Sequence, residues 1–84
     1  MAGQGFGSQA YTPLFTLYTT KFAYTAANLL EYQGWCIPGT PTAAAGWAIC
    51  KFTYSSGLTT DIQWADGNQL MDNVWDDRAS LTYS

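Results

Sequence analysis

Aspartates are the one group of reactive side chains that clusters in this sequence. The cluster consists of Asp66, Asp72, Asp76 and Asp77. Asp66-Gly67-Asn68 resembles the start of a calcium loop, but the alternating oxygen ligands and the terminal glutamate of such a loop do not follow. The structural alternative is that Asp66 holds a turn, Asp72 is solvated, and Asp76 and Asp77 form a polar end near Arg78. We favour that alternative and expect no metal and no cofactor.

Nucleophilic catalysis lacks its usual base here. The chain contains no histidine, so serine and cysteine side chains have no imidazole to activate them. Cys36 and Cys50 belong to no redox or nucleophile motif. We therefore expect no catalytic residues and no enzymatic activity, and we expect both cysteines to be small apolar core residues rather than a disulfide.

Two other groups of residues carry binding chemistry. Arg78 is one of three cations and follows two aspartates, so its planar guanidinium can clamp a carboxylate in the same chain or across a subunit boundary, or remain solvated. Aromatic rings can stack on a sugar, although tryptophans are more often core or interface residues, which is the role we favour. The four tryptophans are Trp35, Trp47, Trp64 and Trp75.

Size and composition favour association with other chains. A chain of 84 residues forms one domain and buries too little surface to be very stable alone. Only 11% of the residues are charged, while 17% are aromatic. So few charges leave surface that other chains would cover. The alternative is a small β-domain coated with Thr, Ser and Gln that is soluble on its own.

Charge and hydropathy exclude two classes of partner. The net charge is −3 with three cations, which gives no electrostatic footprint for nucleic acid. No apolar run reaches the roughly 18 residues of a membrane span. The N-terminus also lacks the basic start and apolar centre of a signal peptide, so we expect the chain to fold in a cytoplasm.

The clearest structural unit is a β-hairpin. Trp47 to Tyr54 is rich in aromatic and branched residues, and Leu58 to Trp64 alternates, with Leu58, Ile62 and Trp64 on one side. We expect Ser55-Ser56-Gly57 to be a three-residue link that closes through a left-handed glycine. Asp66-Gly67 then predicts a turn that ends the second strand.

The other segments complete an all-β pattern. Residues 14–26 predict one long strand or two short ones, with Tyr18, Phe22 and Tyr24 on one side, and residues 26–32 favour a strand over a short helix. Pro38-Gly39 predicts a tight turn.

The C-terminal residues contain a possible helix. Within residues 68–78, the pairs Leu70/Val74 and Met71/Trp75 stand four apart and predict one or two helical turns. Residues 79–84 predict a last short strand.

These elements predict a small antiparallel β-sandwich or barrel with one short helix and an extended N-terminal arm. The arm is residues 1–13 and the single β-domain is residues 14–84. The arm is rich in Gly, Gln and Ser, and its aromatic residues favour docking on a neighbour. The equal alternative is a frayed terminus in which these aromatic residues are incidental. The interface candidates are Phe6, Tyr11, Phe15, Tyr18, Tyr24 and Arg78.

Several short motifs resemble a group of small, mostly uncharacterised proteins of tailed bacteriophages. The resemblance covers residues 29–84. It implies a virion component and no enzymatic role, although Cys50 stands where a basic or polar residue is more usual. The motifs are Tyr32-Gln33-Gly34-Trp35, Pro38-Gly39-Thr40, Trp47-Ala48-Ile49-Cys50-Lys51, Trp64-Ala65-Asp66-Gly67 and the ending from Asp72 to Ser84, DNVWDDRASLTYS.

Composition and resemblance lead to one functional hypothesis and one alternative. The hypothesis is a bacteriophage virion structural protein that acts by assembly, either as a capsid decoration or cement protein or as a tail or fibre component. Its partners would be further copies of itself and other virion proteins, and assembly would take place in the host cytoplasm. The alternative is a carbohydrate or host-receptor binding module built on the tryptophans.

Overall fold

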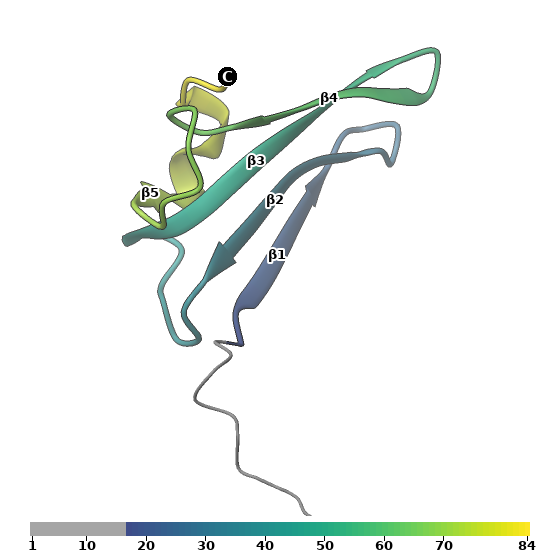
Figure 1. The fold of residues 1–84 in the computed structure, drawn as a ribbon. Helices are drawn as coiled ribbons and strands as arrows, with labels where there is room; N and C mark the ends of the chain where they lie inside the picture. The colour runs from purple at the N-terminus through teal and green to yellow at the C-terminus, as the bar shows by residue number, and fades with distance from the viewer. Residues whose placement is uncertain (1–16) are drawn as a thin grey trace, which may run out of the picture.

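The computed structural model describes residues 17–84, which form one antiparallel sheet and one 3₁₀ helix (Figure 1). The expected all-β architecture with a short helix is therefore confirmed. The predicted arm, residues 1–13, lies outside the described residues. The elements are β1 (Thr19–Tyr24), β2 (Leu30–Cys36), β3 (Ala45–Ser55), β4 (Leu58–Trp64), β5 (Asn73–Val74) and the 3₁₀ helix η2 (Trp75–Ser80).

The sheet is organised around β3, its longest strand. The order is β1-β2-β3-β4, and β5 also pairs with β3. The eleven residues of β3 leave room for two partners on the edge opposite β2. There β4 pairs with the C-terminal half of β3, and β5 pairs with its first residues through Trp47↔Asn73. Chain that follows β4 thus returns to the sheet at the opposite end of β3.

The predicted β3–β4 hairpin is present, but its turn is shorter than expected. A register shift between Thr53 and Tyr54 also moves Leu58 away from the side of Ile62 and Trp64, where the alternation predicts it. Ser55 belongs to β3 and pairs with Leu58, so only Ser56 and Gly57 connect the strands. Both have positive φ, 53° and 80°, as a type I′ turn requires. The twist of this turn matches that of the strands, which explains why a serine accepts the left-handed conformation. The predicted turn at Pro38-Gly39 is also present, with Gly39 at φ 92°.

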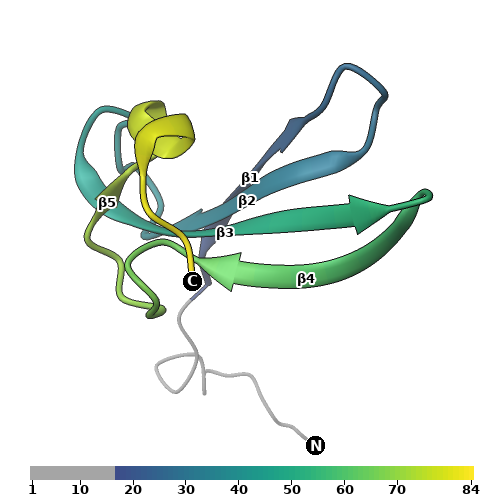
Figure 2. The same ribbon diagram turned by 90° about the horizontal axis from the view of Figure 1, so that it is seen from above.

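One face of the sheet is covered by the C-terminal residues, and we call it the closed face (Figure 2). Side chains alternate along each strand, and the strand register places Tyr32, Gly34 and Cys36 of β2 beside Trp47 and Ile49 of β3 on this face. Helix η2 and the residues after it pack against these positions. Leu81 and Tyr83 contact the core, but the strand predicted over residues 79–84 is not present: residues 79 and 80 belong to η2, and Tyr83 makes only an isolated bridge to Ala65.

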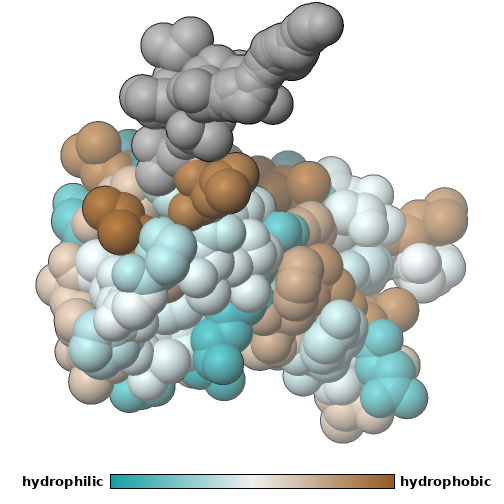
Figure 3. Space-filling model, turned by 90° about the horizontal axis from the view of Figure 1, so that it is seen from below, coloured by the Kyte–Doolittle hydropathy of each residue, from teal (hydrophilic) through white to brown (hydrophobic). Residues whose placement is uncertain are grey.

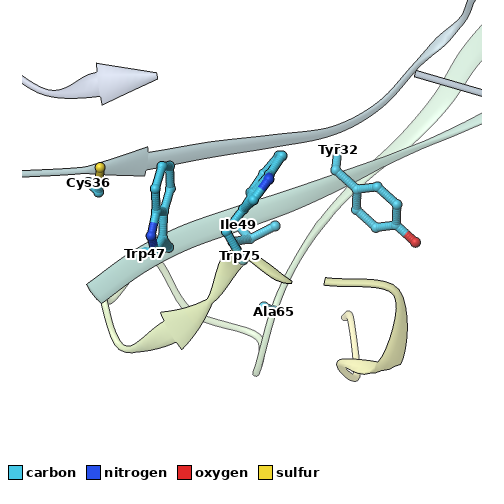
Figure 4. Close-up of a cluster of buried hydrophobic side chains, with 6 residues drawn as sticks. All are labelled: Tyr32, Cys36, Trp47, Ile49, Ala65 and Trp75. Carbon is cyan, nitrogen blue, oxygen red and sulfur yellow. The ribbon is translucent and has the colours of Figure 1, made fainter. Parts of the chain in front are cut away.

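The core is a small cluster centred on two tryptophans (Figure 4). Trp47 and Trp75 are 2% and 3% exposed, and their ring centroids are 5.6 Å apart. Gly34 leaves the space that Trp75 occupies, because a Cβ at this glycine would lie 2.6 Å from Trp75 Cε3. The Trp47 indole N–H donates to the Pro41 carbonyl at 3.0 Å, so its polar atom is satisfied.

Backbone hydrogen bonds fasten the C-terminal residues to the end of β4. Trp64 and Ser84 exchange two N–H···O bonds of 3.0 Å, and the Asp66 N–H donates to the Thr82 carbonyl at 2.8 Å. A loop bond adds to this fastening, since the Asp76 N–H donates to the Thr42 carbonyl at 3.1 Å. The closed face is therefore held by hydrogen bonds as well as by apolar packing.

The predicted helix begins later than the residue spacing suggests. Val74 belongs to β5, and η2 starts only at Trp75. Leu70, which belongs to one of the pairs that predict the helical turns, is 61% exposed. The Leu70 N–H donates to Asn68 Oδ1 at 3.0 Å, a local bond that competes with helix formation. Pairing of Asn73 with β3 then keeps the chain extended up to η2.

Candidate binding surface

The second face of the sheet has no covering element within residues 17–84, and we call it the open face (Figures 1 and 2). Alternation along the strands and their register define which side chains belong to it. They are Tyr18, Thr20, Phe22, Gln33, Trp35, Ala48, Cys50, Phe52, Ile62 and Trp64.

Two tryptophans meet above the middle of this face. Trp35 on β2 and Trp64 on β4 stand on either side of β3, and their stacked rings have centroids 5.4 Å apart. The strands that carry them are separated by β3, about 10 Å from each other, so the two indoles must lean inward. Small residues allow this, because Ala48 and Cys50 are the β3 residues that pair with Trp35 and Trp64. Both small side chains are consequently buried, at 5% and 1% exposure.

A shallow pocket lies beside the stacked pair. Its volume is about 310 Å³, and its wall consists of Tyr18, Trp35, Ala48, Trp64, Gln69 and Met71. Tyr18 and the two tryptophans supply aromatic surface, and Gln69 supplies an amide from the chain between β4 and β5. The size is at the lower limit for a small-molecule site, and it suits a single ring.

The rest of the open face is more apolar than a solvated face should be. An antiparallel sheet that has one face covered usually carries polar residues on the other. Here Phe22 and Ile62 are 50% and 51% exposed, and Phe52 is half-buried beside Ile62. Figure 3 shows the surface from below, where hydrophobic areas are interspersed with pale and hydrophilic ones.

Charged side chains of the strands are nearly all on the closed side. Lys21 pairs with Gly34, Lys51 pairs with Tyr32, and Asp61 pairs with Thr53, which places all three opposite the open face. Glu31 is the remaining charged residue in the strands, and it lies at the irregularity between β1 and β2. The open face thus combines large apolar side chains with a lack of charge.

A second pocket, of about 330 Å³, lies at the edge of the closed side and includes Arg78. The Arg78 guanidinium carbon is 4.7 Å from the centroid of the Trp75 ring, and its Nη1 donates to the Trp75 carbonyl at 3.2 Å. Arg78 therefore stacks on the core rather than standing free in solvent. The wall of this pocket consists of Ala23, Tyr24, Glu31, Tyr32, Asp76, Arg78 and Ala79.

The described interface candidates fall into these two pockets. Tyr18 lines the pocket of the open face, while Tyr24 and Arg78 line the second pocket. Tyr18 and Tyr24 were expected on one side of β1, but a register shift at Ala23/Tyr24 interrupts the alternation. Phe6, Tyr11 and Phe15 lie outside the described residues.

Sequence reasoning missed the largest side chains of the open face as interface candidates, namely Phe22, Trp35, Phe52, Ile62 and Trp64. The available signal was alternation on two strands, since Phe22 shares a side with Tyr18, and Ile62 shares a side with Trp64. What the sequence does not contain is the choice of face, which depends on where the C-terminal residues pack.

Buried titratable groups on the sheet are held in their neutral form. Burial raises the pKa of the Cys50 thiol, which makes it a weak nucleophile near neutral pH. Burial also raises the pKa of Tyr32; Glu31 adds to this shift and Arg78 opposes it. Both cysteines are free and buried, which confirms the expectation that they are apolar core residues.

Two features are absent from the described part of the chain. Within residues 17–84, no three Cys, His, Asp or Glu side chains are grouped so that they could hold a metal ion. The helical residues in the same range form no segment long and apolar enough to cross a membrane.

Comparison of the chain with protein-family models, curated proteins and solved structures found no match.

Proposed function

We propose that this chain is a structural subunit of a bacteriophage virion, which acts by assembly as a capsid decoration or cement protein or as a tail or fibre component. Its partners are further copies of itself and other virion proteins, and it assembles in the host cytoplasm. The observation that carries the proposal is the uncharged, apolar open face. Monomeric proteins rarely leave contiguous apolar patches larger than a few hundred Å² in contact with water.

The size of the folded unit supports the same proposal. The fully buried cluster is small, and it lies at one end of the sheet. Strand β4 is mostly exposed along its length. A subunit that buries this sheet against other subunits gains apolar contacts that residues 17–84 do not supply by themselves.

Composition analysis of virions tests the proposal. Virions of the phage that encodes the chain are purified and digested, and peptides of the chain are quantified by mass spectrometry against the major capsid protein. We expect hundreds of copies per particle for a decoration protein, and a few dozen or fewer for a tail or fibre component. Complete absence of the chain from purified virions would contradict the proposal.

The aromatic pocket favours a second candidate, a module that binds carbohydrate or a host receptor. Tyr18, Trp35 and Trp64 present ring surface around a cavity that suits one sugar ring, and the Gln69 amide can bond to a hydroxyl group. A glycan array probed with the wild-type protein and with Gln69→Ala tests this candidate. Binding that weakens in Gln69→Ala but not in Leu70→Ala, which changes an exposed neighbour, supports it, and no binding by the wild type removes it.

A further inference from the structure

The open face has the chemistry of a surface that pairs with a copy of itself. Its ten residues include no charged side chain, and the Lys21, Lys51 and Asp61 side chains lie on the other side of the sheet. In a two-fold dimer each patch meets an identical patch, so a patch with charges of a single sign would repel its copy. A face without charge avoids this repulsion even though the whole chain has a net charge of −3.

The large apolar side chains of the open face supply more than half of the area that a standard dimer interface buries per partner. Tyr18, Phe22 and Ile62 are each about half exposed, at 47%, 50% and 51%. Together with the partly exposed rings of Trp35, Trp64 and Phe52, they present roughly 450 Å², compared with about 800 Å² per partner in a standard interface. Neighbouring polar side chains such as Thr20 and Gln33 add to this area.

We propose that the open face binds the open face of a second copy, so that the two sheets stack as the two layers of a β-sandwich. Phe22, Phe52 and Ile62 lie between the layers, which are about 10 Å apart in such packings. The inference rests on the proposed function, since it names the partner through which the subunit begins to assemble. The closed faces, with their C-terminal residues, then point outward on both sides of the dimer.

Light scattering on the full-length chain over a range of micromolar concentrations tests this dimer. The test variants are Phe22→Glu and Ile62→Glu, which put a charge on the open face. Leu58→Glu is the matched control, because Leu58 is 71% exposed and pairs with Ser55 on the other side of the sheet. Circular dichroism and urea unfolding check whether each variant remains folded.

We expect the wild type and Leu58→Glu to reach twice the monomer mass, and both open-face variants to raise the dimer Kd by at least about thirtyfold. A dimer that survives Phe22→Glu and Ile62→Glu but is lost in Leu58→Glu would overturn the inference, because the contact would then be elsewhere. The proposed function would survive that result. It would fail separately if the chain were absent from purified virions.

The N-terminal residues provide a second way to overturn the inference. In a full-length variant that carries Phe6→Ser, Tyr11→Ser and Phe15→Ser, the aromatic anchors of residues 1–16 are removed. We expect this variant to dimerise as the wild type does. A monomeric wild type that becomes a dimer in the triple variant would mean that residues 1–16, and not a second copy, cover the open face.

Discussion

The two faces of the sheet each involve two tryptophans, but they use them differently. On the closed face, Trp47 and Trp75 come from separate layers and are almost completely buried. On the open face, Trp35 and Trp64 come from the same layer, stack on each other and remain partly exposed. A tryptophan is therefore buried here only where a second layer meets the sheet, and the open face lacks that layer within residues 17–84.

The two faces also differ in how small residues accommodate the tryptophan rings. Gly34 makes room for a ring that arrives from the C-terminal residues. Ala48 and Cys50 make room for rings that lean over from neighbouring strands. We therefore expect substitutions on the closed face to lower the free energy of unfolding, and substitutions on the open face to weaken association between copies.

Truncation of the central tryptophan should have the largest effect. Trp75→Ala removes a ring that packs on Trp47, Gly34 and Arg78, and we expect a loss of about 3–5 kcal/mol in the free energy of unfolding. Trp35→Ala is the matched change on the open face and should cost roughly 1–2 kcal/mol, because its ring is only partly buried. Urea unfolding measures both. Equal losses would remove the distinction between the faces.

Filling the space under Trp75 should have the next largest effect. Gly34→Ala places a Cβ 2.6 Å from Trp75 Cε3, and we expect a loss of about 1–3 kcal/mol from overpacking. Adding Trp75→Leu to Gly34→Ala should then cost less than Trp75→Leu costs alone, because the smaller side chain relieves the clash. Strictly additive losses in the double variant would show that the two residues do not compete for space.

Removal of the Tyr83 hydroxyl should have a smaller effect at neutral pH. The hydroxyl donates to the Arg78 carbonyl at 2.8 Å, and Tyr83→Phe should cost about 0.5–1.5 kcal/mol. Burial raises the pKa of Tyr83 well above its ordinary value of 10.0, and the neighbouring Tyr32 adds to the shift. The folded state therefore holds a proton that the unfolded state releases above pH 10, so stability falls as pH rises through that range.

Urea unfolding at a series of alkaline pH values measures this dependence. The decline in the free energy of unfolding above the ordinary tyrosine pKa should be shallower in Tyr83→Phe than in the wild type. Tyr24→Phe is a suitable control, since Tyr24 is 61% exposed. Identical slopes in wild type and Tyr83→Phe would mean that Tyr83 titrates as an ordinary tyrosine.

A conservative change on the open face should have the smallest effect on folding. Ile62→Thr keeps the β-branched shape and removes apolar surface that is 51% exposed. We expect the free energy of unfolding of the dilute monomer to change by less than about 0.5 kcal/mol. Chemical denaturation at low protein concentration measures it. A loss comparable to that of Gly34→Ala would place Ile62 in the monomer core.

Strand positions were predictable because their signals are local. Alternation in residues 58–64 and the turn residues Pro38-Gly39 predicted elements that the structure contains. The helix start was not predictable from spacing, because Val74 forms a strand pair with Ala45, a partner far away in the sequence. The same limit applies to the candidate site, because the closed face is defined by contacts between residues far apart in the sequence, such as Gly34 and Trp75.

Hydroxyl-radical footprinting at low and high protein concentration tests the central claim most directly, because it reports on the open face residue by residue. We predict that Phe22, Ile62 and Trp35 are modified in dilute protein and become protected at high concentration. Trp47 and Trp75 should be protected at both concentrations, and Leu58 should be modified at both. Equal modification of Phe22 and Ile62 at the two concentrations would contradict the account.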